Sequence, residues 1–165
     1  MWIALLLSAC GSDKPKQVSA GDYVTGLCNA VKVFARDLDT RSSTLVAAGK
    51  LPPARARPEL VSYLQATGKD AHTAAGSLRA LGTPSVPGGQ SFASGLVTGF
   101  DQLGIRLDHS AALARKLPTG AGYHSAATRL DQSLRSAMGS LASSETSSIK
   151  SGPLAAAARK ATACR

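Results

Sequence analysis

The chain has 165 residues, the length of one ordinary domain that can bury a core without metal or many disulfides. Hydrophobic residues make up 44% and aromatic residues 4% of it, which excludes wholesale disorder and predicts a helix-favouring core of Ala, Leu and Val. The formal net charge of +9 is spread along the chain. The positive charge would attract an anionic partner, such as lipid headgroups, envelope polymers or nucleic acid. It would equally be explained by solubility alone.

The first nine residues form an uncharged apolar stretch that ends in small residues. This stretch is shorter than the roughly 20 apolar residues that cross a bilayer, so we expect residues 1–9 to be a secretory signal peptide. The following sequence, Leu7-Ser8-Ala9-Cys10, resembles the bacterial lipobox, in which the cysteine receives a diacylglyceryl group and the peptide before it is removed. The resemblance implies that Cys10 is lipidated and that residues 10–19 form a polar tether.

Two features of this segment leave alternatives open. No positive charge precedes the apolar run, so either the true start codon lies upstream of Met1 or the signal is weak. The segment could instead begin a core helix with Cys10 as a buried thiol. Gly11-Ser12-Asp13-Lys14-Pro15 follows at once and breaks any helix, which favours the signal and tether.

The three cysteines are expected to have two different roles, lipidation and disulfide formation. If Cys10 carries lipid, Cys28 and Cys164 remain as a pair, and an exported protein meets an oxidising environment in which such a pair would cross-link. The bond would close nearly the whole domain into a ring and, in the chain-entropy model, would stabilise it by about 4 to 5 kcal/mol. The alternative is two independent buried thiols. No cysteine or histidine spacing typical of a metal site occurs.

The next two stretches carry apolar residues at three- and four-residue intervals, which predicts amphipathic helices. Ser19 or Asp22 can cap the first helix, whose apolar stripe starts at Val24 and continues to residue 49. The Leu51-Pro52-Pro53 sequence then forces a break. We expect Pro58 to be the first residue of the second helix, which continues to residue 81.

A loop over residues 82–89 precedes the third helix, whose stripe runs over residues 92–114. Thr119 is expected to open the fourth helix, with a stripe over residues 123–141. A Ser-rich loop or frayed end covers residues 140–152, and Pro153 starts a short helix that runs to Cys164. No stretch alternates with a period of two residues, so no strand is expected.

Residues 20–165 are therefore expected to form an all-α domain, an up-down-up-down four-helix bundle with a short C-terminal helix returning to the first helix. The lipobox, Cys28, the turn over residues 81–92 and the final Ala163-Cys164 resemble small, largely uncharacterised helical lipoproteins of high-GC Gram-positive bacteria. The resemblance implies this fold and a lipid-anchored position on the extracytoplasmic face of the cell membrane. It implies no activity.

Signals for chemistry are weak. His72, His109 and His124 flank the apolar stripes and are expected at the surface, and no catalytic or phosphate-binding motif occurs, so we expect neither enzymatic activity nor a cofactor. Nucleic-acid binding is not expected either, because single-strand binders stack bases on exposed aromatic side chains. Only Tyr63 lies off its stripe here, whereas the other aromatic residues of the helices lie on core stripes: Phe34, Phe92, Phe100 and Tyr123.

Two non-enzymatic functions remain. The first is a membrane-anchored binding or interaction module that contacts an unidentified envelope protein, with anionic lipids or envelope polymers as further partners. The second is a carrier whose bundle core holds a lipid or another apolar small ligand. Glycines of the second and third helices could leave space for that ligand, or they could serve close helix packing: Gly68, Gly76, Gly95, Gly99 and Gly104.

Overall fold

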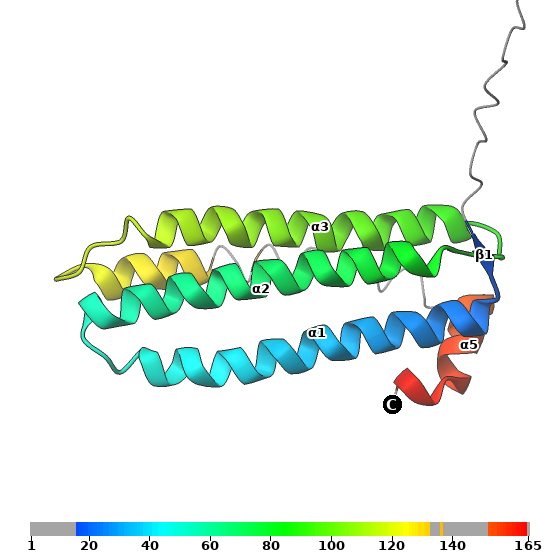
Figure 1. The fold of residues 1–165 in the computed structure, drawn as a ribbon, viewed down its shortest axis with the longest axis horizontal. Coiled ribbons are helices and arrows are strands. Elements are labelled where there is room, and N and C mark those ends of the chain that lie inside the picture. The colour runs from blue at the N-terminus through cyan, green and yellow to red at the C-terminus, as the bar shows by residue number, and fades with distance from the viewer. Residues whose placement is uncertain (1–15, 133–135, 137–151, 165) are drawn as a thin grey trace, which may run out of the picture.

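The computed structural model describes residues 16–132, 136 and 152–164. This part is almost entirely helical, which confirms the all-α class (Figure 1). Three long helices, α1 (Ala20–Ala48), α2 (Pro53–Leu81) and α3 (Gly89–Ala114), alternate in direction, with α2 in contact with both α1 and α3. A short helix, α5 (Pro153–Lys160), and a 3₁₀ turn, η1 (Thr162–Cys164), pack on α1, as expected for a C-terminal helix that returns to the first one.

Several predicted features lie outside the described residues. They are the signal peptide over residues 1–9, the lipidated Cys10, most of the Ser-rich stretch over residues 140–152, and the last part of the fourth apolar stripe at Leu134, Ala137, Met138 and Leu141. Residues 123–132 of the predicted fourth helix are described and are helical.

Ser19 is the residue that caps α1. Its hydroxyl accepts a hydrogen bond from the Asp22 amide at 3.1 Å and donates one to the Asp22 carboxylate at 2.7 Å. The cap satisfies one of the free amides at the start of the helix. Both candidates for the cap therefore take part, and α1 ends before Gly49 as predicted.

The predicted start of the second helix was wrong. The helix α2 begins at Pro53, and Pro58 lies inside it. Proline fits the first helical position because the amide that it lacks has no partner there. Pro58 removes only one further hydrogen bond from the helix. It lies near the N-terminal end, where the first amides have no partner within the helix in any case. The break at Pro52 is as predicted.

Two other helix ends differ from the prediction. The fourth helical segment begins at Tyr123 rather than Thr119, because Gly122 has a φ of 96°, which a right-handed helix cannot contain. The short C-terminal helix ends at Lys160, and the remainder of the stretch to Cys164 is the 3₁₀ turn η1.

A parallel pair of two-residue strands, which we did not predict, ties residues near the tether to the helices. The strand β1 (Gln17–Val18) pairs with β2 (Thr83–Pro84), and the Thr83 and Ser85 amides donate to the carbonyls of Lys16 and Val18 at 2.7 and 2.8 Å. Two residues are too few to produce an alternating pattern, so this pairing leaves no sequence signal. The last residues of the predicted tether thus lie against the helical domain.

The buried apolar side chains form two clusters. One contains Tyr23, Leu27, Leu78, Ala93 and Leu96, where the start of α1 meets the end of α2 and the start of α3. The disulfide between Cys28 and Cys164 lies in the same part, and we call residues 16–30, 78–96 and 152–164 the disulfide end. The second cluster lies further along the same helices: Leu64, Ala71, Leu103, Leu107, Ala111 and Ala114.

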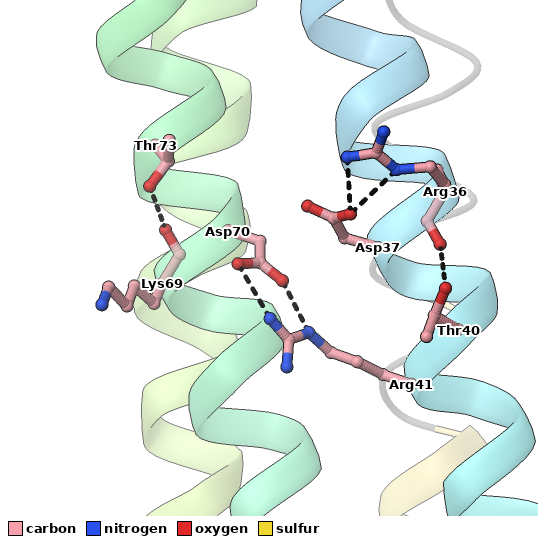
Figure 2. A network of polar contacts seen from close by, with 7 residues as sticks. All are labelled: Arg36, Asp37, Thr40, Arg41, Lys69, Asp70 and Thr73. Carbon is pink, nitrogen blue, oxygen red and sulfur yellow. Dashed lines mark hydrogen bonds and ion pairs between the residues drawn. The ribbon is translucent and has the colours of Figure 1, made fainter.

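A polar contact links α1 to α2 beside the second cluster, next to Ala71 in the sequence of α2 (Figure 2). The Arg41 guanidinium reaches from α1 to both carboxylate oxygens of Asp70 on α2, with Nε at 2.8 Å and the second nitrogen at 3.3 Å. The neighbouring pair Arg36–Asp37 lies within α1 alone. Of these two pairs, the Arg41–Asp70 pair is the one that joins α1 to α2.

Candidate functional site

An apolar cavity of about 810 Å³ lies between α1, α2 and residues 123–132, with Leu103 and Leu107 of α3 also in its wall. We call the surrounding residues, 34–67 and 103–132, the cavity end. The walls from the other elements are formed by Phe34, Ala35, Leu38, Asp39, Ser42, Leu45, Val46 and Gly49 of α1 and its cap, by Ala56, Leu60, Tyr63, Leu64 and Thr67 of α2, and by Tyr123, His124, Ala127, Thr128, Leu130 and Asp131.

The burial pattern of α1 explains why the space exists. The buried residues of α1 are Tyr23, Val24 and Leu27 near its start and Ala48 at its end. Between them the predicted apolar stripe is only partly covered, and its members Phe34, Leu38 and Leu45 line the cavity: all three are half-buried. The middle of α1 thus leaves apolar side chains partly uncovered at the cavity wall.

The inner part of the cavity contains an unpaired hydroxyl. Thr67 is 3% exposed, lines the cavity, and its Oγ1 has no hydrogen-bond partner among the described residues. Leaving a buried hydroxyl unpaired costs about 1–3 kcal/mol. The same hydroxyl could bond to a polar atom of a ligand. The sequence placed Thr67 on the apolar stripe of the second helix, but nothing in it indicated that the hydroxyl would face a cavity.

The Tyr123 side chain lines the cavity near the chain connections. It is 5% exposed, and its ring meets that of His124 edge-to-face with centroids 5.4 Å apart. Burial raises the pKa of the Tyr123 phenol above its usual value. The phenol therefore stays protonated over the physiological range and can donate a hydrogen bond.

The structure corrects our interpretation of Tyr63. We expected this tyrosine to lie off the apolar stripe, but it is partly buried, packs against the second core cluster and lines the cavity. A tyrosine covers more than one helical face because its ring is long, so its position in the helical period was a poor guide. Phe34, Phe92 and Phe100 lie against the core clusters as predicted, and Tyr123 is buried. The Phe34 and Phe100 rings meet edge-to-face with centroids 5.4 Å apart.

The histidines do not gather. His109 and His124 are exposed, as expected. His72 is half-exposed between two carboxylates of α3, with Nδ1 at 3.4 Å from Asp101 and Nε2 at 3.5 Å from Asp108. These contacts use opposite edges of one ring, so they hold α2 against α3 rather than form a chelate. Among residues 16–132, 136 and 152–164, no group of three His, Cys, Asp or Glu side chains could hold a metal ion.

Two of the glycines that we considered for ligand space, Gly68 and Gly104, serve helix packing instead. A Cβ on Gly68 would lie 2.9 Å from an Asp108 oxygen and 3.4 Å from the Gly104 carbonyl, and a Cβ on Gly104 would lie 2.6 Å from the His72 ring. These two glycines let α2 and α3 approach closely. Gly76 and Gly95 face open space, and none of the five predicted glycines lines the cavity.

Cys28 and Cys164 form a disulfide in the structure, with 5.1 Å between their Cα atoms and a sequence separation of 136. This Cα separation lies within the usual range for a bonded pair. The bond joins α1 to the C-terminal turn η1, and neither cysteine lines the cavity.

The fold and the site define a helical protein with an apolar cavity that carries a few polar groups. Comparison with protein-family models, with curated proteins and with solved structures finds no match to this chain. In the part of the chain that the structure describes, no helix is both long and apolar enough to cross a bilayer. The function must therefore be argued from the site itself.

Proposed function

We propose that this protein is a non-enzymatic, lipid-anchored envelope protein that binds a small, mainly apolar ligand in the cavity between α1, α2 and residues 123–132. The observation that carries this proposal is the cavity itself. Its volume of about 810 Å³ lies in the range of ligand sites, and most of its walls are aliphatic or aromatic. The unpaired Thr67 hydroxyl adds a polar anchor of the kind that fixes a ligand's orientation.

The compartment and the anchor are part of the same proposal. The lipobox at residues 7–10 supports lipidation of Cys10, and a disulfide between Cys28 and Cys164 fits an exported, oxidised protein. Two or more acyl chains on one cysteine hold a protein stably at a membrane. We expect Cys10→Ala to move the protein from the membrane fraction to the soluble fraction, measured by fractionation and immunoblotting. Persistence in the membrane fraction would contradict the anchor.

We also propose that the helical segment beginning at Tyr123 is the fourth helix of an up-down-up-down bundle. The helical conformation of residues 123–132 supports this, as does Leu130, which packs against the second core cluster.

Docking of an envelope protein ranks below ligand binding. The exposed large apolar side chains of the described residues are scattered over α1 and α3 rather than gathered on one face: Val31, Val33, Val46, Ile105 and Leu113. Single exposed apolar residues are normal on protein surfaces.

Native mass spectrometry of the protein extracted from its own membrane tests ligand binding. We expect an additional noncovalent mass that disappears on denaturation. A bulky side chain on the cavity wall, Ala127→Trp, should abolish this mass, whereas Ser125→Trp, at an exposed position that does not line the cavity, should retain it. Wild-type protein without a bound mass, or equal occupancy in the two variants, would contradict the proposal.

Thr67→Val removes the hydroxyl while keeping the side-chain shape. We expect this variant to bind the ligand more weakly although the ligand-free protein unfolds at the same or a higher temperature, because a buried unpaired hydroxyl is lost. Unchanged affinity together with lower stability would show that the hydroxyl serves folding instead.

A further inference from the structure

Cations gather at the cavity end of the molecule. The connection between α1 and α2 and the end of α3 lie at the same end, opposite α5 (Figure 1). Residues 48–59 and 114–123, which form these connections, contain five cations and only one carboxylate, that of Glu59. We call the five cations the basic cluster: Lys50, Arg55, Arg57, Arg115 and Lys116.

Carboxylates do not neutralise this cluster. Among the described residues, none of its five members forms an ion pair. Four of the side chains belong to exposed residues. The fifth, Arg57, is half-buried and donates to the Leu117 carbonyl at 3.0 Å, which ties the start of α2 to the chain after α3. The basic cluster is therefore a local excess of positive charge, in which a hydrogen bond fixes the position of one member, Arg57.

Helix stability accounts for only some of these charges. Lys50, Arg115 and Lys116 follow the C-terminal ends of α1 and α3, where the helix dipole favours cations. Arg55 and Arg57 lie in the first turns of α2, where the dipole disfavours them, and the first turn of that helix contains no acidic residue. These two arginines therefore need an explanation other than helix formation.

The basic cluster is next to the cavity in sequence, although none of its five members lines the wall. The cavity wall includes Gly49, next to Lys50, and Ala56, which lies between Arg55 and Arg57. The wall follows α1 from Phe34 to Gly49, about 22 Å at 1.5 Å per residue. An elongated, mainly apolar space, with Asp39 and Asp131 also in its wall, thus runs from the middle of the helices to a positively charged end.

We propose that the ligand is an anionic amphiphile with one long apolar chain, which lies along the cavity while its carboxylate or phosphate headgroup meets the basic cluster. The inference rests on the proposed function and specifies the ligand class. The protonated Tyr123 phenol, near the same end of the cavity, supplies a further donor for the headgroup.

Ligands with the same chain and different headgroups test this proposal. We would measure dissociation constants of the purified protein, freed of copurified ligand, for palmitate, hexadecanol and hexadecyltrimethylammonium below their micelle concentrations. We expect palmitate to bind at least about tenfold more tightly than hexadecanol. The cation should bind most weakly. The advantage of palmitate should shrink as salt rises, because exposed charges are screened.

Matched variants localise the effect. Arg55→Gln with Lys116→Gln removes two exposed members of the basic cluster, and Arg106→Gln with Lys160→Gln removes one arginine and one lysine from exposed positions elsewhere. We expect the first double variant to lose most of the preference for palmitate while it binds hexadecanol unchanged. The second should behave as the wild type does.

Further comparisons show which anionic headgroup the ligand carries and which results would overturn the proposal. If palmitate binds more tightly than a lysophosphatidylglycerol, the ligand carries a carboxylate headgroup. If the lysophosphatidylglycerol binds more tightly than palmitate, the ligand carries a phosphate headgroup. Either result upholds the proposal. Equal affinity for palmitate and hexadecanol would overturn it while leaving the cavity function intact. Failure of all these ligands to bind would contradict the proposed function as well. If the cluster variant lost only its binding to anionic vesicles and kept its preference for palmitate, the cluster would be a membrane contact, which also overturns the proposal.

Discussion

The two ends of the same three helices are built differently. At the disulfide end, a covalent bond, a strand pair and a buried aromatic residue, Tyr23, hold the start of α1 in place. At the cavity end, α1 keeps its apolar side chains half-covered around a space of about 810 Å³. Local stability within one protein varies in this way, and binding regions are drawn from its less stable parts. The comparison suggests that the disulfide end maintains the fold while the cavity end can admit a ligand.

The largest expected effect comes from breaking the cross-link. Replacing Cys28 and Cys164 together by Ser should lower the free energy of unfolding by about 4–5 kcal/mol, because the bond closes a very long loop. Chemical denaturation of the oxidised wild type and of the double variant measures the difference. Equal stability would show that the disulfide end does not depend on the bond and would weaken the comparison.

A glycine substitution at the disulfide end should have the next largest effect. Gly82 has φ 87° and ψ −145°, a conformation that is essentially restricted to glycine, and a Cβ there would collide with the Lys16 carbonyl oxygen. We expect Gly82→Ala to destabilise the protein by about 1–3 kcal/mol, measured as a shift in the denaturation midpoint.

Gly76→Ala is the matched control, because nothing lies within 4 Å of a Cβ at that helical position. It should stabilise the protein by up to about 1 kcal/mol through helix propensity alone. Destabilisation by Gly76→Ala, or no effect of Gly82→Ala, would show that the packing at this end is not as described.

A smaller effect is expected at the ion pair that joins α1 to α2. Asp70→Asn removes the carboxylate that accepts both bonds from Arg41 and should cost about 1 kcal/mol, because the pair is partly exposed. Asp37→Asn breaks a pair between adjacent residues of α1 and should cost less than about 0.5 kcal/mol. If thermal denaturation shows that both variants lose the same stability, the pair between α1 and α2 contributes nothing specific.

The helices could be predicted because their information is local. Apolar residues at three- and four-residue intervals, the Ser19 cap and the proline break at residue 52 depend only on neighbours in sequence. The pairing of Cys28 with Cys164 followed from the odd number of cysteines once Cys10 was set aside. The start of α2 was missed because Pro53 and Pro58 both suit the beginning of a helix and only the folded chain decides between them.

The cavity could not be predicted, because it depends on how far one helix lies from another. The apolar stripe of α1 looks the same whether a neighbour covers it, as at Leu27, or leaves it open, as at Leu38. The glycines gave a misleading signal, since Gly68 and Gly104 bring α2 and α3 together and leave no space. The basic cluster could not be predicted either, because Arg115 and Lys116 are distant from Arg55 and Arg57 in sequence.

Hydrogen exchange of the native protein with and without palmitate tests the central claim most directly, that the cavity end binds a ligand while the disulfide end stays unchanged. We predict that palmitate slows amide exchange in residues 34–49, 56–67 and 123–132 and leaves residues 20–30 and 153–164 as they were. Protection confined to the disulfide end, or no protection at a concentration that saturates binding, would contradict the account.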